Sequence, residues 1–181
     1  MTIDALIGVL PPPAIPCEPF SGPWGPVERQ LGMLLPPDYK DFARLYGGGY
    51  FMEFLGVYIP RYRNQYVRLE YQCRAVCATF AGDDDLPYPM WPERDGLIPF
   101  GQTDNGDYLF WLRRGLPAEW RVVVWDRGDF TFEVIDRDLT GFLAGVATGE
   151  VAPKAFPEDM LPCDRLFIPN WAVPRPPPDE A

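Results

Sequence analysis

Carboxylates are the side chains of this sequence that could do chemistry, because the usual partners of a catalytic carboxylate are missing. The chain contains no histidine, and Ser21 is its only serine. Histidine is the usual general base near neutral pH and the commonest protein ligand of metal ions. Ser-His-Asp and Cys-His mechanisms are therefore excluded within one chain. An enzyme built on this sequence would have to be a carboxylate- or metal-dependent hydrolase that uses its aspartates.

Asp83, Asp84 and Asp85 form the one run of acidic residues, in a predicted loop over residues 81–95. Clustered carboxylates can bind calcium or magnesium, but the spacing of an EF-hand loop is absent. Neighbouring side chains of a loop point in different directions, which argues against acid–base catalysis. A solvated loop is the plain alternative. Of the functional interpretations, we favour a negatively charged surface that meets a basic partner.

Apolar side chains in the same loop would suit a protein interface. Tyr88, Met90 and Trp91 lie beside the acidic run, and aromatic residues and methionine are enriched in interface cores. Further carboxylates follow in this loop and around the turn predicted at Asn105-Gly106. The candidate partner-contact residues are Asp83, Asp84, Asp85, Trp91, Glu93, Asp95, Asp104 and Asp107.

The net charge of −10 restricts the classes of partner. Nucleic acids and anionic membranes are bound mainly through positive charge, so we expect neither to bind this chain. An acidic protein steers basic partners toward itself. The alternative is that the negative charge serves only solubility, and net charge by itself does not distinguish the two.

The four cysteines do not predict a metal site. Cys73 and Cys77 are four residues apart on a predicted helix, whereas Cys17 and Cys163 stand alone. Zinc sites usually combine two such close pairs. We therefore expect reduced thiols that pack as small apolar side chains, and we expect no metal and no other cofactor.

Strands must position the acidic loops. Residues 96–134 contain short runs rich in Val, Phe, Tyr and Trp, which favour β-strands. Asn105-Gly106 predicts a turn because both residues tolerate positive φ. A second turn predicts a hairpin of residues 121–125 and 130–134. Residues 50–58 should form another strand, or two short strands broken at Gly56.

Apolar stripes at a spacing of three and four residues predict four helices. Asp136 or Asp138 can cap the last of them. Together with the strands, these helices indicate an α+β domain, with an antiparallel-rich sheet of four to six strands and helices packed on one face. The predicted helices cover residues 27–35, 39–46, 62–80 and 139–146.

Several motifs resemble the SUKH superfamily, which groups a fungal cell-wall-synthesis regulator with many bacterial immunity proteins. The run from Leu97 to Trp111 (Leu-Ile-Pro-Phe-Gly-Gln-Thr-Asp-Asn-Gly-Asp-Tyr-Leu-Phe-Trp) resembles the family's C-terminal half, as do the strand ending at Trp125 and the closing Phe-Leu-Ala-Gly-Val helix. The segment from Val27 to Gly49 resembles its opening, although Tyr-Gly-Gly-Gly replaces the usual Asn-Gly-Gly. The likeness covers roughly residues 24–150 and is a pattern of loosely specified positions.

This resemblance implies a SUKH-like fold and a non-enzymatic binding function. Bacterial members are similar to immunity proteins, which bind and block a cognate toxin domain, often a nuclease or a deaminase. The expected partner is therefore a basic protein toxin. The alternative is a regulatory scaffold, similar to the fungal relative, that binds protein partners through its proline-rich ends.

Length and composition predict one globular domain with proline-rich ends. The chain has 181 residues, of which 47% are hydrophobic, enough for one core. We expect a proline-rich arm over residues 1–23, a SUKH-like domain over residues 24–150, and an extension over residues 151–181 that packs on the domain before it frays. The sequence shows neither an apolar run of membrane-spanning length nor a secretory start, so we expect a cytoplasmic protein.

Overall fold

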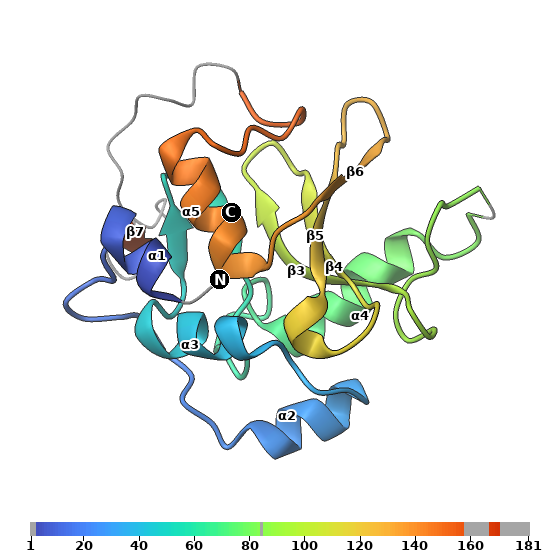
Figure 1. The fold of residues 1–181 in the computed structure, drawn as a ribbon. Coiled ribbons are helices and arrows are strands. Elements are labelled where there is room, and N and C mark those ends of the chain that lie inside the picture. The colour runs from blue at the N-terminus through green and yellow to red at the C-terminus, as the bar shows by residue number, and fades with distance from the viewer. Residues whose placement is uncertain (1–2, 84, 158–166, 171–181) are drawn as a thin grey trace, which may run out of the picture.

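The computed structural model describes residues 3–83, 85–157 and 167–170 (Figure 1). Five α-helices, one 3₁₀ turn at Pro117–Glu119 and seven strands are described in these ranges. The helices are α1 (Ile3–Val9), α2 (Trp24–Leu31), α3 (Pro37–Leu45), α4 (Leu69–Thr79) and α5 (Leu139–Thr148). The strands are β1 (Gly49–Phe51), β2 (Leu55–Val57), β3 (Leu97–Thr103), β4 (Tyr108–Leu112), β5 (Arg121–Trp125), β6 (Phe132–Ile135) and β7 (Phe167–Pro169).

All seven strands join one sheet in the order β6-β5-β4-β3-β2-β1-β7, and every neighbouring pair is antiparallel. The predicted α+β class with an antiparallel sheet is confirmed. The predicted strand number of four to six is slightly too low, because residues 50–58 contribute to two strands, the second of the two predicted alternatives, and because β7 comes from the C-terminal extension.

The first face of the sheet carries the main hydrophobic core. Figure 1 shows α1, α3 and α5 gathered on this side. Trp111 of β4 lies at its centre, with its ring 4.9 Å from that of Tyr39 on α3. The Tyr39 hydroxyl is fully buried and donates a hydrogen bond of 2.7 Å to the carbonyl of Tyr58. This bond fixes α3 against the chain that leaves β2.

The second face carries a smaller apolar cluster. Successive side chains of a strand point to opposite faces of the sheet, so the Phe110 side chain lies on the face opposite that of its neighbour Trp111. Phe110 packs with Val76 and Phe80 at the C-terminal end of α4, whereas Leu69 and Cys73 at its beginning belong to the main core. The end of α4 therefore covers the face opposite α5, and the helices are not confined to one side of the sheet.

The residues before the first proline run form part of the main core. Leu6 of α1 and Leu10 are fully buried, and the carbonyl of Leu10 accepts a hydrogen bond of 2.6 Å from the Tyr46 hydroxyl. The division into an arm, a domain and an extension stays a prediction. Trp171, up to which the extension is expected to pack, and the frayed end expected beyond it lie outside the described residues.

Two predicted boundaries are wrong for local reasons. The chain between β1 and β2 reverses at Met52 and Glu53, which both have positive φ, and not at Gly56. The helix predicted from residue 62 begins at Leu69 instead. Residues 60–68 form a closed loop, in which the Arg68 side chain donates a hydrogen bond of 2.6 Å to the Tyr62 carbonyl.

The last helix and the hairpin before it agree with the sequence. The Asp138 carboxylate accepts a hydrogen bond of 2.8 Å from the Gly141 N–H, so Asp138 is the N-cap of α5. β5 and β6 form the predicted hairpin, and its turn is closed by hydrogen bonds of 2.7 and 3.2 Å from the N–H groups of Gly128 and Asp129 to the Asp126 carboxylate.

Candidate partner-binding site

An open groove of about 500 Å³ lies on the second face of the sheet. Its base is Phe80 at the end of α4, one wall is formed by Asp83 and residues 85–88, and the other wall is the β5–β6 hairpin with Trp125 and Phe132. The groove exists because α4 covers the second face only over one end of the strands. The aromatic residues toward the hairpin turn are left half-buried.

The groove is built from aromatic rings in edge or tilted contact. The Phe80 ring lies 5.1 Å from Trp125 and 6.3 Å from Phe132. Tyr88 contacts Phe132 from the loop side at 6.4 Å. Phe130 contacts Trp125 at 6.0 Å yet remains 73% exposed. A large exposed aromatic ring beside a hollow is typical of an interface anchor.

The acidic run supplies the rim of this groove. Asp83 and Asp85 are exposed and both line it. The Asp85 N–H donates a hydrogen bond of 3.1 Å to the Asp83 carboxylate, which holds the loop turned at this point. Asp84 lies outside the described residues. The predicted pairing of negative charge with Tyr88 in one surface is thus present at these two aspartates.

An arginine already lies beside the aromatic wall. The guanidinium of Arg114, from the β4–β5 connection, lies 5.6 Å from the centre of the Tyr88 ring. Such a cation–π contact is worth about 0.5–1 kcal/mol at an exposed site. Tyr88 therefore presents a ring face on which a guanidinium is stable.

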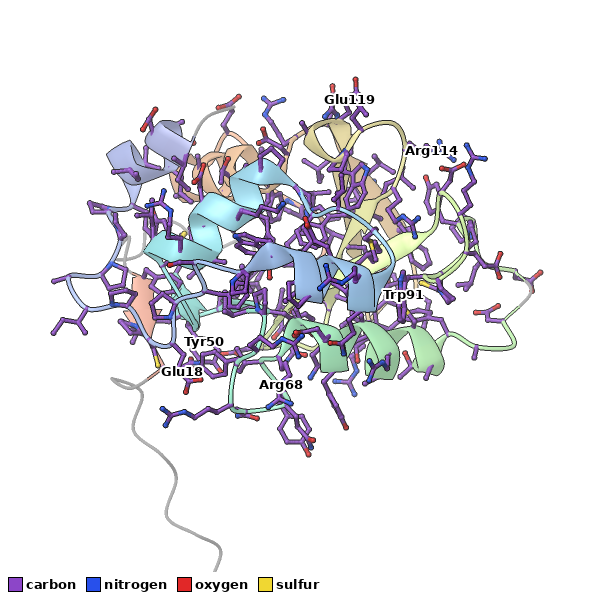
Figure 2. All side chains as sticks on the ribbon, turned by 90° about the horizontal axis from the view of Figure 1, so that it is seen from below. Glu18, Tyr50, Arg68, Trp91, Arg114 and Glu119 are labelled. Carbon is purple, nitrogen blue, oxygen red and sulfur yellow. The ribbon has the colours of Figure 1, made fainter. Side chains whose placement is uncertain are left out.

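Trp91 occupies a different place from the one expected. It lies between α2 and α4 (Figure 2), and its indole N–H donates a hydrogen bond of 2.9 Å to the Leu31 carbonyl. The half-buried ring packs against the main core. Trp91 therefore fastens the loop to α2. Glu93 and Asp95 follow it and are exposed.

Asp104 and Asp107 flank one turn but have different surroundings. Asp104 is exposed and lines a separate hollow of about 140 Å³ with Tyr66 and Asn170, where burial raises the pKa of its carboxyl. Asp107 is only 3% exposed. Its two carboxylate oxygens accept hydrogen bonds from the Thr103 hydroxyl at 2.7 Å and from the Arg127 N–H at 3.0 Å. Both oxygens of the Asp107 carboxylate therefore accept hydrogen bonds from within the protein.

The hairpin side of the groove could not be predicted from the sequence. Phe130, Phe132 and Val134 alternate along the chain, and this spacing predicts only a strand. In the structure Phe132 lies opposite Trp125, which lies opposite Tyr108. The exposure of Phe130 at 73% and of Val134 at 45% becomes visible only when the position of β6 in the sheet is known.

A second acidic hollow of about 440 Å³ lies where α3 and α5 begin. The Asp38 carboxylate accepts a hydrogen bond of 3.0 Å from the Thr140 N–H and lies close to Asp138. Burial raises the pKa of the Asp38 carboxyl, and the negative charge of Asp138 adds to this, while the hydrogen bond from Thr140 opposes both. Asp4 and Asp41 also line the hollow.

We expect Asp38→Asn to reduce the loss of stability toward neutral pH. Because the folded-state pKa of Asp38 lies above its ordinary value of 3.8, the folded state binds the proton more tightly than the unfolded state. The free energy of unfolding therefore falls as the pH rises from the ordinary pKa of an aspartate through the raised pKa of Asp38. Urea unfolding from about pH 4 to about pH 7 should show that the free energy of unfolding of the variant rises relative to that of the wild type.

Asp41→Asn is the control for this experiment, since Asp41 lies in the same hollow and pairs with Arg44 at an exposed position. It should change the free energy of unfolding by less than about 0.5 kcal/mol. If the free energy of unfolding depends on pH in the same way for the wild type and for Asp38→Asn, the assigned role of Asp38 is contradicted.

Metal binding and membrane insertion are two other classes of function. In residues 3–83, 85–157 and 167–170, no group of three or more His, Cys, Asp or Glu side chains could hold a metal ion. Within the same residues, no helix has both the length and the apolar character needed to cross a membrane.

Comparison with known proteins places this fold in a family. The SUKH_6 family model, described as SMI1-KNR4 cell-wall, matches residues 24–143. This span begins with α2, includes β1 to β6 and ends within α5, so it contains the elements that build the groove. No curated protein and no solved structure matches the chain. Because the family model covers well over half of the sequence, the chain belongs to the SUKH superfamily, in the SMI1-KNR4 family.

Proposed function

We propose that this protein is a non-enzymatic immunity protein that binds and neutralises a cognate basic toxin domain, a nuclease or a deaminase. Membership of the SUKH superfamily supports a binding role of this kind. The observation that carries the proposal is the groove of the second face, in which exposed aspartates border a set of half-buried aromatic rings. We place the protein in the cytoplasm, where such a toxin would act.

The chemistry of the groove suits a basic protein surface. Phe130 and Tyr88 offer apolar area for anchoring, and interface energy is concentrated in such aromatic anchors. Asp83 and Asp85 offer negative charge at the rim, where charge chiefly increases the rate of encounter. Nuclease toxins are usually basic because their substrate is a polyanion, so an acidic inhibitor can occupy the same surface.

The proposal is tested by calorimetry with the C-terminal domain of a large secreted protein encoded beside this one. We expect a dissociation constant in the nanomolar range that weakens as salt is added, because complementary charges are screened. Absence of binding would remove the cognate-toxin assignment for that neighbour.

Charge reversal should locate the contact. Asp83→Lys combined with Asp85→Lys is expected to slow toxin association by about tenfold or more at low salt and to flatten its salt dependence, because steering depends on local charge. Stopped-flow kinetics at several salt concentrations measures both effects.

The matched control reverses Asp4 and Asp41, which lie in the other acidic hollow. Both double variants change the net charge equally. If they slow association equally, total charge steers the partner and the groove assignment is wrong. If neither has an effect, the acidic rim is not part of the contact.

A scaffold that works through the proline-rich ends has less support. Leu6 and Leu10 are buried in the core, so the beginning of the chain is committed to the fold. Deletion of residues 1–20 would therefore damage the domain itself. A deletion that tests the scaffold alternative must be limited to residues 172–181.

A further inference from the structure

Strand β6 is an edge of the sheet. In the order β6-β5-β4-β3-β2-β1-β7 it pairs with β5 on one side, and within the described residues no strand pairs with its other side. An unpaired edge offers a row of N–H and C=O groups to another chain. Natural proteins usually protect such edges with proline, lysine or irregular backbone.

The register shows which backbone groups of β6 point outward. The Asp126 N–H donates to the Thr131 carbonyl at 2.9 Å, so these two residues form a hydrogen-bonded pair. Such pairs alternate along an antiparallel ladder, which turns the backbone of Glu133 toward β5. The N–H and C=O groups of Phe132 and Val134 consequently point away from β5.

The two edges of the sheet are protected differently. At the far edge, β7 ends in Pro169, which has no N–H to donate. β6 reads Phe-Glu-Val-Ile and contains neither proline nor lysine. Its backbone becomes irregular only at its end, where the Arg137 N–H donates to the Ile135 carbonyl. The described structure thus leaves β6 open to pairing.

The side chains beside this edge indicate the chemistry of a partner strand. Phe132 and Val134 share the second face, and Val134 is 45% exposed. A strand added to β6 would place alternate side chains next to the groove, whose rim carries Asp83 and Asp85. A second copy of this chain would bring the same acidic rim, so like charges disfavour pairing of two β6 strands.

We propose that the partner binds by adding an extended segment, with basic and apolar residues alternating along one face, as an eighth strand on β6. This inference rests on the proposed immunity function and specifies how the toxin is recognised. Main-chain hydrogen bonds to Phe132 and Val134 hold the segment, while its side chains enter the groove. Recognition then requires a strand-forming segment on the toxin.

The test uses a synthetic peptide, Arg-Thr-Val-Thr-Arg-Thr-Val, blocked at both ends. Its Arg and Val side chains share one face of a strand. One isomer is N-methylated at the second Arg and both Val residues and the other at the three Thr residues, so that each carries three methyl groups and loses donors of one edge only. We expect millimolar binding of the unmethylated peptide, and a loss of about tenfold or more for one isomer only, because one edge pairs with β6.

Amide hydrogen exchange of the whole protein gives the second measurement. Peptide binding should slow exchange at the outward amides of Phe132 and Val134, whereas docking of side chains alone would not. Equal binding of both isomers, unchanged exchange at these amides, or no binding up to about 5 mM peptide overturns strand addition.

The same exchange measurement with the toxin domain separates the two proposals. Toxin binding without protection of Phe132 and Val134 would leave the immunity function standing and remove strand addition. Edge-specific peptide binding without toxin binding would leave the β6 site standing and remove that toxin as its ligand.

Discussion

Replacement of Phe80 by alanine is expected to destabilise the protein by about 3–5 kcal/mol, as for other buried phenylalanines. Phe80 is only 8% exposed and contacts the rings of Tyr108, Phe110, Trp125 and Phe132 at 5.1–6.3 Å. Its removal opens a cavity between the end of α4 and the sheet. Urea unfolding followed by circular dichroism measures the loss.

Phe130→Ala is the matched control, because the same ring is removed from the same groove at a position that is 73% exposed. It should change stability by less than about 0.5 kcal/mol and yet weaken binding of the partner, since the ring is an exposed anchor. A loss below about 1 kcal/mol for Phe80→Ala would mean that the second cluster does not fasten α4. Unchanged binding by Phe130→Ala would remove this ring from the interface.

Local sequence patterns predicted most of the helices and turns that depend on residues a few positions apart in the chain. The stripe from Leu139 to Val146 and its cap at Asp138 depend on residues within a few positions, and the structure contains both. Tyr62 and Tyr66 had the same helical spacing without forming a helix. The Arg68 side chain occupies the Tyr62 carbonyl, and this local closure competes with the helix.

The groove could not be predicted, because its residues meet only through the register of the sheet. Phe80 ends a helix, Asp83 and Asp85 belong to a loop, and Phe130 follows a turn nearly fifty positions later. The sequence predicted negative charge beside aromatic residues within one loop, but it did not predict that Phe80 and the β5–β6 hairpin complete the groove. Trp91 belongs to the same loop but packs against the core and donates to the Leu31 carbonyl, a long-range contact that local sequence does not reveal.

Replacement of Asp107 by alanine is expected to destabilise the protein by about 2–4 kcal/mol, because one buried and one partly buried donor lose their acceptor. These donors are the Thr103 hydroxyl and the Arg127 N–H. Asp104→Ala is the control, since Asp104 flanks the same turn and is exposed. It should change stability by less than about 0.5 kcal/mol. Urea unfolding of both variants measures the difference.

The effect of Asp107→Ala on partner binding shows whether the Asp107 carboxylate has a structural role or contacts the partner directly. Asp107 joins the β3–β4 turn to Arg127 in the β5–β6 turn, so its loss should loosen the hairpin that carries Phe130. Binding should then weaken through faster dissociation, while the salt dependence of association stays that of the wild type, because no exposed charge is removed. If Asp107→Ala instead keeps full stability and flattens the salt dependence, Asp107 contacts the partner directly, and its burial is relieved when the complex forms.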